Sequence, residues 1–123
     1  MVFPEMSAAI EFSNVSLGYG FGGELIKVLK NISFSVGSDE AVSIVGPSGS
    51  GKTSIIMLAA GLEKSTEGSI KIHGQEITDL KENELSQIRR QNIGIVFQSF
   101  YLIPNLTAIE NVLLSLEANQ KYN

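Results

Sequence analysis

The 123-residue sequence contains no cysteine, which excludes disulfide bridges and cysteine-based metal sites. A chain without disulfides is compatible with a reducing compartment. The sequence also lacks an excess of basic residues, because 9 lysines and arginines stand against 13 aspartates and glutamates, for a formal net charge of −4. A broad basic surface for binding nucleic acids is therefore not expected.

A long apolar run is missing as well. The most apolar stretch, IIMLAAGL, is far shorter than the roughly 20 residues that a membrane-spanning helix needs. The first twelve residues, MVFPEMSAAIEF, show no basic segment followed by an apolar one, so no signal peptide is expected. Any association with a membrane is therefore expected to depend on a partner.

What is present favours a folded domain with a hydrophobic core, since 43% of the residues are hydrophobic and 18% are charged. Apolar and polar residues alternate in AIEFSNVSLGYG and in LIKVLKNISFSV, with a break near Lys30 and Asn31. This period of two predicts half-buried antiparallel strands. The stretch AVSIVG is almost entirely apolar, which is typical of a strand buried on both faces of a parallel sheet.

The remaining sequence alternates predicted helices and strands. KTSIIMLAAGL predicts a buried helix that ends at Gly61, and ENELSQIRRQ predicts a short surface helix. SIKIHG and NIGIVFQ predict further strands, the second of them apolar. Thr107 and Glu110 fit a capping box that begins a last helix. Because no linker divides the sequence, we expect a single α/β domain over residues 1–123.

One motif carries specific chemistry. Gly46, Gly51, Lys52 and Thr53 fit the pattern G-x-x-x-x-G-K-[ST], between a predicted apolar strand and a predicted helix. Glycines allow the backbone to curl so that successive N–H groups face an anion, and the start of the helix adds partial positive charge. Lys52 would place its ammonium near the β- and γ-phosphates, and the Thr53 hydroxyl suits Mg²⁺, which prefers oxygen ligands.

This motif does not stand alone. GPSGSGKT is preceded by VLKNISFSV and followed by NIGIVFQSFYLIPNLTAIENV, and with these three stretches the chain resembles the ATP-binding subunits of ABC transporters. Macrolide-export and lipoprotein-release types are the most similar, over about Ile10 to Leu116. The resemblance implies a P-loop NTPase fold: a β part over about 10–45, a core from the P-loop to the Q-loop over 46–98, and the start of a helical subdomain over 99–123.

The resemblance also implies site residues and cofactors, namely ATP and Mg²⁺. Tyr19, in LGYG, takes the position of an aromatic residue that stacks on adenine, and Gln98, in VFQSF, that of the Q-loop glutamine, a metal ligand. Lys52 and Gln98 are the predicted catalytic residues, and Thr53 and Gln98 the predicted metal ligands. The expected nucleotide-binding residues are Tyr19, Gly46, Pro47, Ser48, Gly49, Ser50, Gly51, Lys52, Thr53 and Ser54.

Partners follow from the same resemblance. Members of the family act with a transmembrane subunit and with a second ATP-binding subunit, so this chain is expected in the cytoplasm, peripherally at the inner face of the membrane. The segment after Gln98 corresponds to the region that meets the transmembrane subunit. Its large apolar residues predict either an interface or a local core under the next helix, and both remain open: Phe100, Tyr101, Leu102 and Ile103.

Several segments of the family are absent from the 123 residues. There is no LSGGQ-like signature, no apolar strand ending in Asp-Glu and no switch histidine. Asp39 and Asp79 do not follow apolar strands, and His73 is expected in a surface turn. The sequence therefore corresponds to the N-terminal half of such an ATPase domain, for which we expect weak nucleotide binding and negligible turnover.

Three alternatives to an ATP-binding half-domain remain. The chain could be a nonenzymatic fragment that binds the transmembrane subunit through about Gln98–Val112, or a decayed gene product without function. An unrelated P-loop kinase or GTPase is disfavoured, because the sequence contains neither an NKxD-type guanine motif nor a strand that ends in aspartate.

Overall fold

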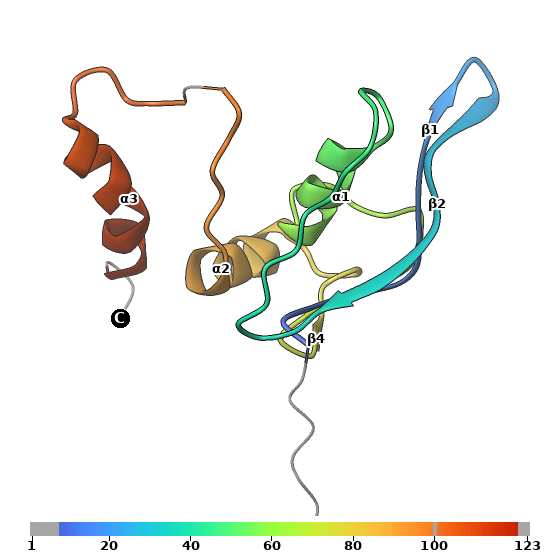
Figure 1. Cartoon of the computed structure of the whole chain (residues 1–123), viewed down its shortest axis with the longest axis horizontal. Helices are drawn as coiled ribbons and strands as arrows, with labels where there is room; N and C mark the ends of the chain where they lie inside the picture. Colours follow the sequence, from blue (N-terminus) through green and yellow to red (C-terminus); the bar gives the residue numbers. More distant parts are fainter. Residues whose placement is uncertain (1–7, 100, 121–123) are drawn as a thin grey trace, which may run out of the picture. The chain divides into compact units, whose positions relative to one another are not determined.

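A computed structural model of the protein describes residues 8–99 and 101–120, with the backbone alone described at 115 and 118–120. The chain forms two compact units, of which the first ends at Lys81 and the second begins at Glu82. Figure 1 shows the course of the chain through both. The boundary lies within the predicted P-loop to Q-loop core at 46–98.

The first unit is a four-stranded antiparallel sheet with one helix. Its elements are β1 (Ile10–Phe21), β2 (Glu24–Val36), α1 (Lys52–Ala59), β3 (Glu67–Ile72) and β4 (Gln75–Glu76). The strand order is β2-β1-β3-β4, and each neighbouring pair is antiparallel. The second unit contains α2 (Glu82–Asn92) and α3 (Ala108–Gln120). The predicted antiparallel part is thus present.

Two-residue turns join β1 to β2 and β3 to β4. Gly22 and Gly23 connect β1 to β2 with φ angles of 56° and 87°, and His73 and Gly74 connect β3 to β4 with 47° and 80°. Positive φ at both central residues is the geometry that best matches the twist of a hairpin. His73 therefore lies in an exposed turn, as the sequence predicted.

The predicted break near Lys30 and Asn31 does not divide β2, which is one strand of 13 residues. Instead, Asn31 has a φ of 51° and locally disturbs the pairing with β1. Its N–H donates to the buried Ser16 Oγ at 3.0 Å, so the bulge leaves this donor satisfied.

The core of the first unit contains aliphatic and aromatic side chains from the sheet and aliphatic ones from α1 and the loops. Its buried hydrophobic residues are Phe12, Val15, Leu17, Leu29, Leu58, Ala60, Ile70, Ile72 and Ile77. Phe12 contacts Phe34 with ring centroids 4.6 Å apart. α1 contacts β3, and within the helix Leu58 is completely buried while Ile56 is exposed. The predicted buried helix is therefore buried on one side only.

α1 ends as its sequence predicted. Gly61 has a φ of 70°, its N–H donates to Leu58 O at 3.1 Å, and the N–H of Leu62 donates to Met57 O at 2.9 Å. These two bonds form a Schellman motif, which satisfies the last carbonyls of the helix. The direction in which the chain leaves α1 is thereby fixed.

Two predicted strands are not formed. Residues 41–45 and 93–97 belong to no strand of the described chain, and their apolar side chains are largely exposed, with Val45 at 88% and Val96 at 100%. A parallel strand needs a neighbouring strand to complete its hydrogen bonds, and parallel sheets are normally covered by helices on both faces. In the part of the chain that the structure describes, the one sheet is antiparallel and pairs with neither segment.

The two helices of the second unit confirm the sequence pattern. In α2 the two apolar residues Leu85 and Ile88 are buried. At the start of α3 the Glu110 N–H donates to Thr107 Oγ1 at 3.2 Å, and the Thr107 hydroxyl donates to Glu110 Oε1 at 3.0 Å, as expected for a capping residue. Among the described residues, no helix has the length and apolar character needed to cross a bilayer.

Candidate functional site

The loop before α1 is curled. The Ser50 N–H donates to Pro47 O at 3.2 Å and closes a turn, in which Gly49 has a φ angle of 80°, and Gly51 follows the turn with a φ of 99°. Only glycine adopts such left-handed conformations without strain, so the glycine spacing of the motif is a requirement of this backbone. The stretch from Gly46 to Gly51 is therefore folded back on itself rather than extended.

The N-terminus of α1 faces this loop without a competing acidic group. Gly51 is the N-cap, no side chain caps the helix, and its first turn contains no acidic residue. The first intrahelical bond runs from the Ile55 N–H to Gly51 O at 3.1 Å. Because the first N–H groups of any α-helix lack intrahelical acceptors, they and the helix dipole favour an anion at this end.

Lys52 lies across the curled loop. Its Nζ donates to Pro47 O at 2.8 Å and to Gly46 O. These two bonds hold the ammonium at the rim of the loop. Lys52 is also the first residue of α1. Combined with the curled backbone, this arrangement concentrates positive charge where the sequence predicted phosphate groups.

Close packing explains the glycine at position 51. A Cβ at Gly51 would lie 2.7 Å from Cδ2 of the buried Leu29 and 3.4 Å from Val28 O, whereas a Cβ at Gly46 would meet only the movable Ser50 Oγ, at 2.8 Å. Since real Cβ atoms do not approach so closely, the loop end fits against β2 only with glycine at 51. The end of the loop therefore packs against the sheet.

The motif contains four hydroxyl groups that are close together in the sequence. Thr53 is exposed in the first turn of α1, Ser54 is half-buried, and Ser48 and Ser50 are exposed in the loop. No group of three or more histidine, aspartate or glutamate side chains suited to a metal ion occurs among the described residues. A hydroxyl and phosphate oxygens are the oxygen ligands that Mg²⁺ accepts, so these residues fit a magnesium-bound polyphosphate.

Tyr19 lies in β1 opposite Ile26 and is 41% exposed. Its hydroxyl donates to Glu63 Oε2 at 3.2 Å. Partial burial, that hydrogen bond and the negative charge of Glu63 raise the pKa of the Tyr19 phenol. Two positions earlier on the same strand, Leu17 pairs with Leu29, the neighbour of Gly51. Tyr19 and the loop are thus at the same part of the sheet.

Gln98 belongs to the second unit, where it is exposed just after the irregular segment at 93–97. Its predicted role as metal ligand and catalytic residue stays a prediction. Phe100, one of the predicted apolar residues, lies outside the described residues. The other three are exposed and do not form a local core: Tyr101 at 76%, Leu102 at 64% and Ile103 at 46%.

Asn111 holds the loop that carries these apolar residues. Its Oδ1 accepts the Ile103 N–H at 2.9 Å, and its Nδ2 donates to Thr107 O at 2.9 Å and Leu106 O at 3.2 Å. No sequence pattern marks Asn111, because an asparagine within a helix has no distinctive spacing. Its contacts give residues 103–107 a defined backbone.

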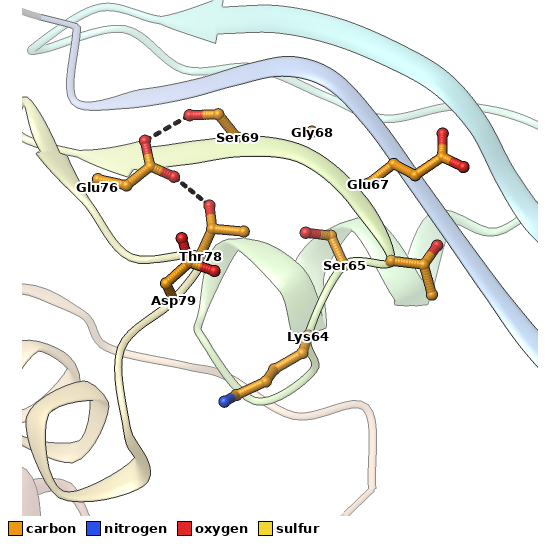
Figure 2. Close-up of a pocket in the computed structure, with 9 residues that line it drawn as sticks. Lys64, Ser65, Glu67, Gly68, Ser69, Glu76, Thr78 and Asp79 are labelled. Carbon is orange, nitrogen blue, oxygen red and sulfur yellow. Dashed lines mark hydrogen bonds between the residues drawn. The ribbon is translucent and has the colours of Figure 1, made fainter.

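The first unit also contains a polar hollow of about 590 Å³ beside β3 and β4. Figure 2 shows Glu76 between Ser69 and Thr78, whose hydroxyls both donate to its carboxylate. Although partial burial raises it, these bonds hold the pKa of Glu76 below its ordinary value. Glu67 and Asp79 add negative charge against one lysine, Lys64, so this hollow does not suit a phosphate.

Comparisons with known proteins show the family of the chain. The family model described as ABC transporter matches residues 29–123. An uncharacterized ABC transporter ATP-binding protein of Methanocaldococcus jannaschii, MJ0796, is 48% identical over 107 residues, which are 87% of this chain and 46% of that protein. The macrolide export ATP-binding/permease protein MacB of Salmonella typhi is 40% identical over 107 residues, 87% of this chain and 16% of that protein.

Solved structures give the same result. The dimeric structure of MJ0796 in a post-hydrolysis state, bound to ADP and Pi, superposes with a TM-score of 0.83 at 45% identity. The match covers 89% of this chain and 47% of that one. The chain therefore spans about half the length of MJ0796, and a smaller share of MacB.

Proposed function

Because this chain belongs to the ABC transporter family, we propose that it is the ATP-binding portion of a transporter ATPase subunit, which would power transport through a transmembrane partner. Its fold is part of the P-loop NTPase cassette, as the resemblance implied. The observation that supports nucleotide binding best is the curled loop with the Lys52 ammonium at its rim and the N-terminus of α1 behind it.

Each residue of the site has a role in this proposal. The backbone N–H groups of the loop bind phosphate oxygens, and Lys52 neutralises charge on the β- and γ-phosphates. Thr53 would hold Mg²⁺, which would neutralise phosphate charge when bound, and a metal-binding role of Gln98 is proposed from the family resemblance alone. Ser54 adds a hydroxyl near the α-phosphate, and the face of Tyr19 stacks on adenine.

We do not propose that these 123 residues hydrolyse ATP by themselves. The sequence contains no acidic residue after an apolar strand, no signature loop and no switch histidine, so it lacks the groups that would activate water and stabilise the transition state. We propose that the chain binds ATP and turns it over negligibly.

The first test compares ATP with AMP by titration calorimetry in the presence of Mg²⁺. Because the loop recognises the phosphate chain rather than the base, AMP should bind roughly tenfold more weakly than ATP or worse. Phosphate release from ATP should be no faster than with the Lys52→Ala variant. Equal affinity for ATP and AMP would contradict a phosphate-binding site in the loop. ATP turnover well above that of the Lys52→Ala variant would contradict the proposed lack of hydrolysis.

We also propose that the second unit binds the transmembrane partner and so locates the chain at the inner face of the membrane. The exposed apolar side chains of Tyr101, Leu102 and Ile103 support this. α3 adds exposed apolar residues at helical spacing: Ile109, Val112, Leu113 and Leu116. A dimer with a second ATP-binding subunit is proposed by analogy with the dimeric MJ0796 cassette.

Capture on an immobilised MacB-type permease in detergent tests this surface. The double substitution Tyr101→Ser and Leu102→Ser should lower the affinity roughly tenfold or more, since burial of each large apolar side chain contributes about 1.5–3 kcal/mol. Leu25→Ser, which alters an equally exposed leucine of β2, is the matched control and should have no effect. Equal capture of all three proteins would exclude this surface as the docking site.

A further inference from the structure

Tyr19 is connected to a residue far away in the sequence. Its hydroxyl donates to Glu63 Oε2 at 3.2 Å, across 44 positions of sequence. Glu63 follows the Schellman turn of Leu58, Gly61 and Leu62, so its backbone is placed by the end of α1. A strand side chain is thus tied to the exit of the helix that follows the phosphate loop.

The Glu63 carboxylate is itself held in place. It is half-buried, and its second oxygen, Oε1, accepts the Lys64 N–H at 3.4 Å. Tyr19, in contrast, is 41% exposed. The edge of the phenol ring that carries the hydroxyl is therefore anchored, while part of the ring remains open to solvent. An anchored edge with an accessible surface is what a stacking platform requires.

We propose that Glu63 is a positioning residue that holds the Tyr19 ring in the orientation in which it stacks on a nucleotide base. This role rests on the proposed function of the site. Without the bond, the ring can rotate about its side-chain torsions, and binding then has to restrict that freedom. Preorganisation of one side chain is worth about 3- to 10-fold in affinity.

The test uses the whole chain and two probes, ATP and inorganic tripolyphosphate, each with Mg²⁺. Glu63→Ala should weaken ATP binding about 3- to 10-fold and leave tripolyphosphate binding unchanged, because only ATP has a base to stack. Glu63→Gln keeps an acceptor oxygen and should restore most of the affinity. Glu67→Ala is the control, since it removes the same charge from an exposed position of the first unit.

Two further measurements separate positioning from a general structural effect. In a Tyr19→Phe background, Glu63→Ala should have no additional effect on ATP, because there is no hydroxyl left to anchor. The sequence has three tyrosines, so substituting Tyr101 and Tyr122 by phenylalanine allows Tyr19 to be titrated by absorbance. In the variant that retains only Tyr19, Glu63→Ala should lower the pKa of Tyr19 towards its ordinary value.

The outcomes are distinguishable. If Glu63→Ala weakens ATP and tripolyphosphate equally, or weakens neither, the positioning role is wrong. An additional loss on top of Tyr19→Phe, or an unchanged pKa of Tyr19, also overturns it. If the unaltered chain binds neither probe, the proposed function itself fails, and the role of Glu63 fails with it.

Discussion

Lys52→Ala should weaken the binding of Mg-ATP roughly 10- to 100-fold. The ammonium lies at the rim of the curled loop, bonded to Gly46 O and Pro47 O, and a hydrogen bond to a charged group contributes about 1.5–3 kcal/mol. In the variant, the backbone N–H groups and the helix N-terminus remain, so binding is reduced rather than abolished. Titration calorimetry at fixed salt measures the difference.

Lys64→Ala is the matched control for this experiment. Lys64 is an exposed lysine of the same unit and lines the polar hollow rather than the loop. Its removal should change the affinity for ATP only through the net charge of the protein, and salt screens this long-range effect. If both variants lose the same affinity, or if Lys52→Ala binds normally, phosphate recognition by the loop is excluded.

Gly68→Ala should destabilise the first unit by roughly 2–5 kcal/mol. Gly68 has a φ of 89°, and a Cβ there would lie 2.3 Å from Asn14 O and 2.7 Å from Ser13 O. Left-handed strain in a residue other than glycine costs about 1–2 kcal/mol, and overpacking adds about 1–3 kcal/mol. Both neighbours are backbone atoms of β1, so no side chain can move aside to relieve the contact.

Urea unfolding followed by circular dichroism measures this loss as a lower midpoint with an unchanged slope. Gly74→Ala separates the two contributions, because Gly74 has a φ of 80° but nothing within 4 Å of its Cβ position. It should lose only about 1–2 kcal/mol. If the two variants are equally destabilised, the contact of a Cβ at position 68 with the backbone of β1 adds nothing to the cost, and the overpacking explanation is wrong.

The roles of Lys52 and Gly68 differ in how far they can be read from the sequence. Lys52 was identified from the motif, since one turn of loop and the start of one helix contain everything that it contacts. The importance of Gly68 could not be identified from the sequence, because its close neighbours are on another strand, more than fifty positions earlier. Glu63 was missed for the same reason, as its partner Tyr19 is distant in sequence.

Local signals in the sequence were sufficient for the features that depend on neighbouring residues. The alternation that predicts β1 and β2, the glycine that ends α1 and the capping pair Thr107 and Glu110 all act within a few residues, so sequence alone determined them. The curl of the phosphate loop belongs to the same class, because Gly49 and Gly51 set their own backbone angles.

Only the tertiary structure decided the rest. Residues 41–45 and 93–97 have strand composition, but a strand needs a hydrogen-bonded neighbour, and the described chain gives them none. The anchoring of Tyr19 by Glu63 likewise depends on how β1 and the end of α1 are brought together. Contacts within a few residues can be read from spacing, whereas contacts between distant segments exist only once the chain has folded.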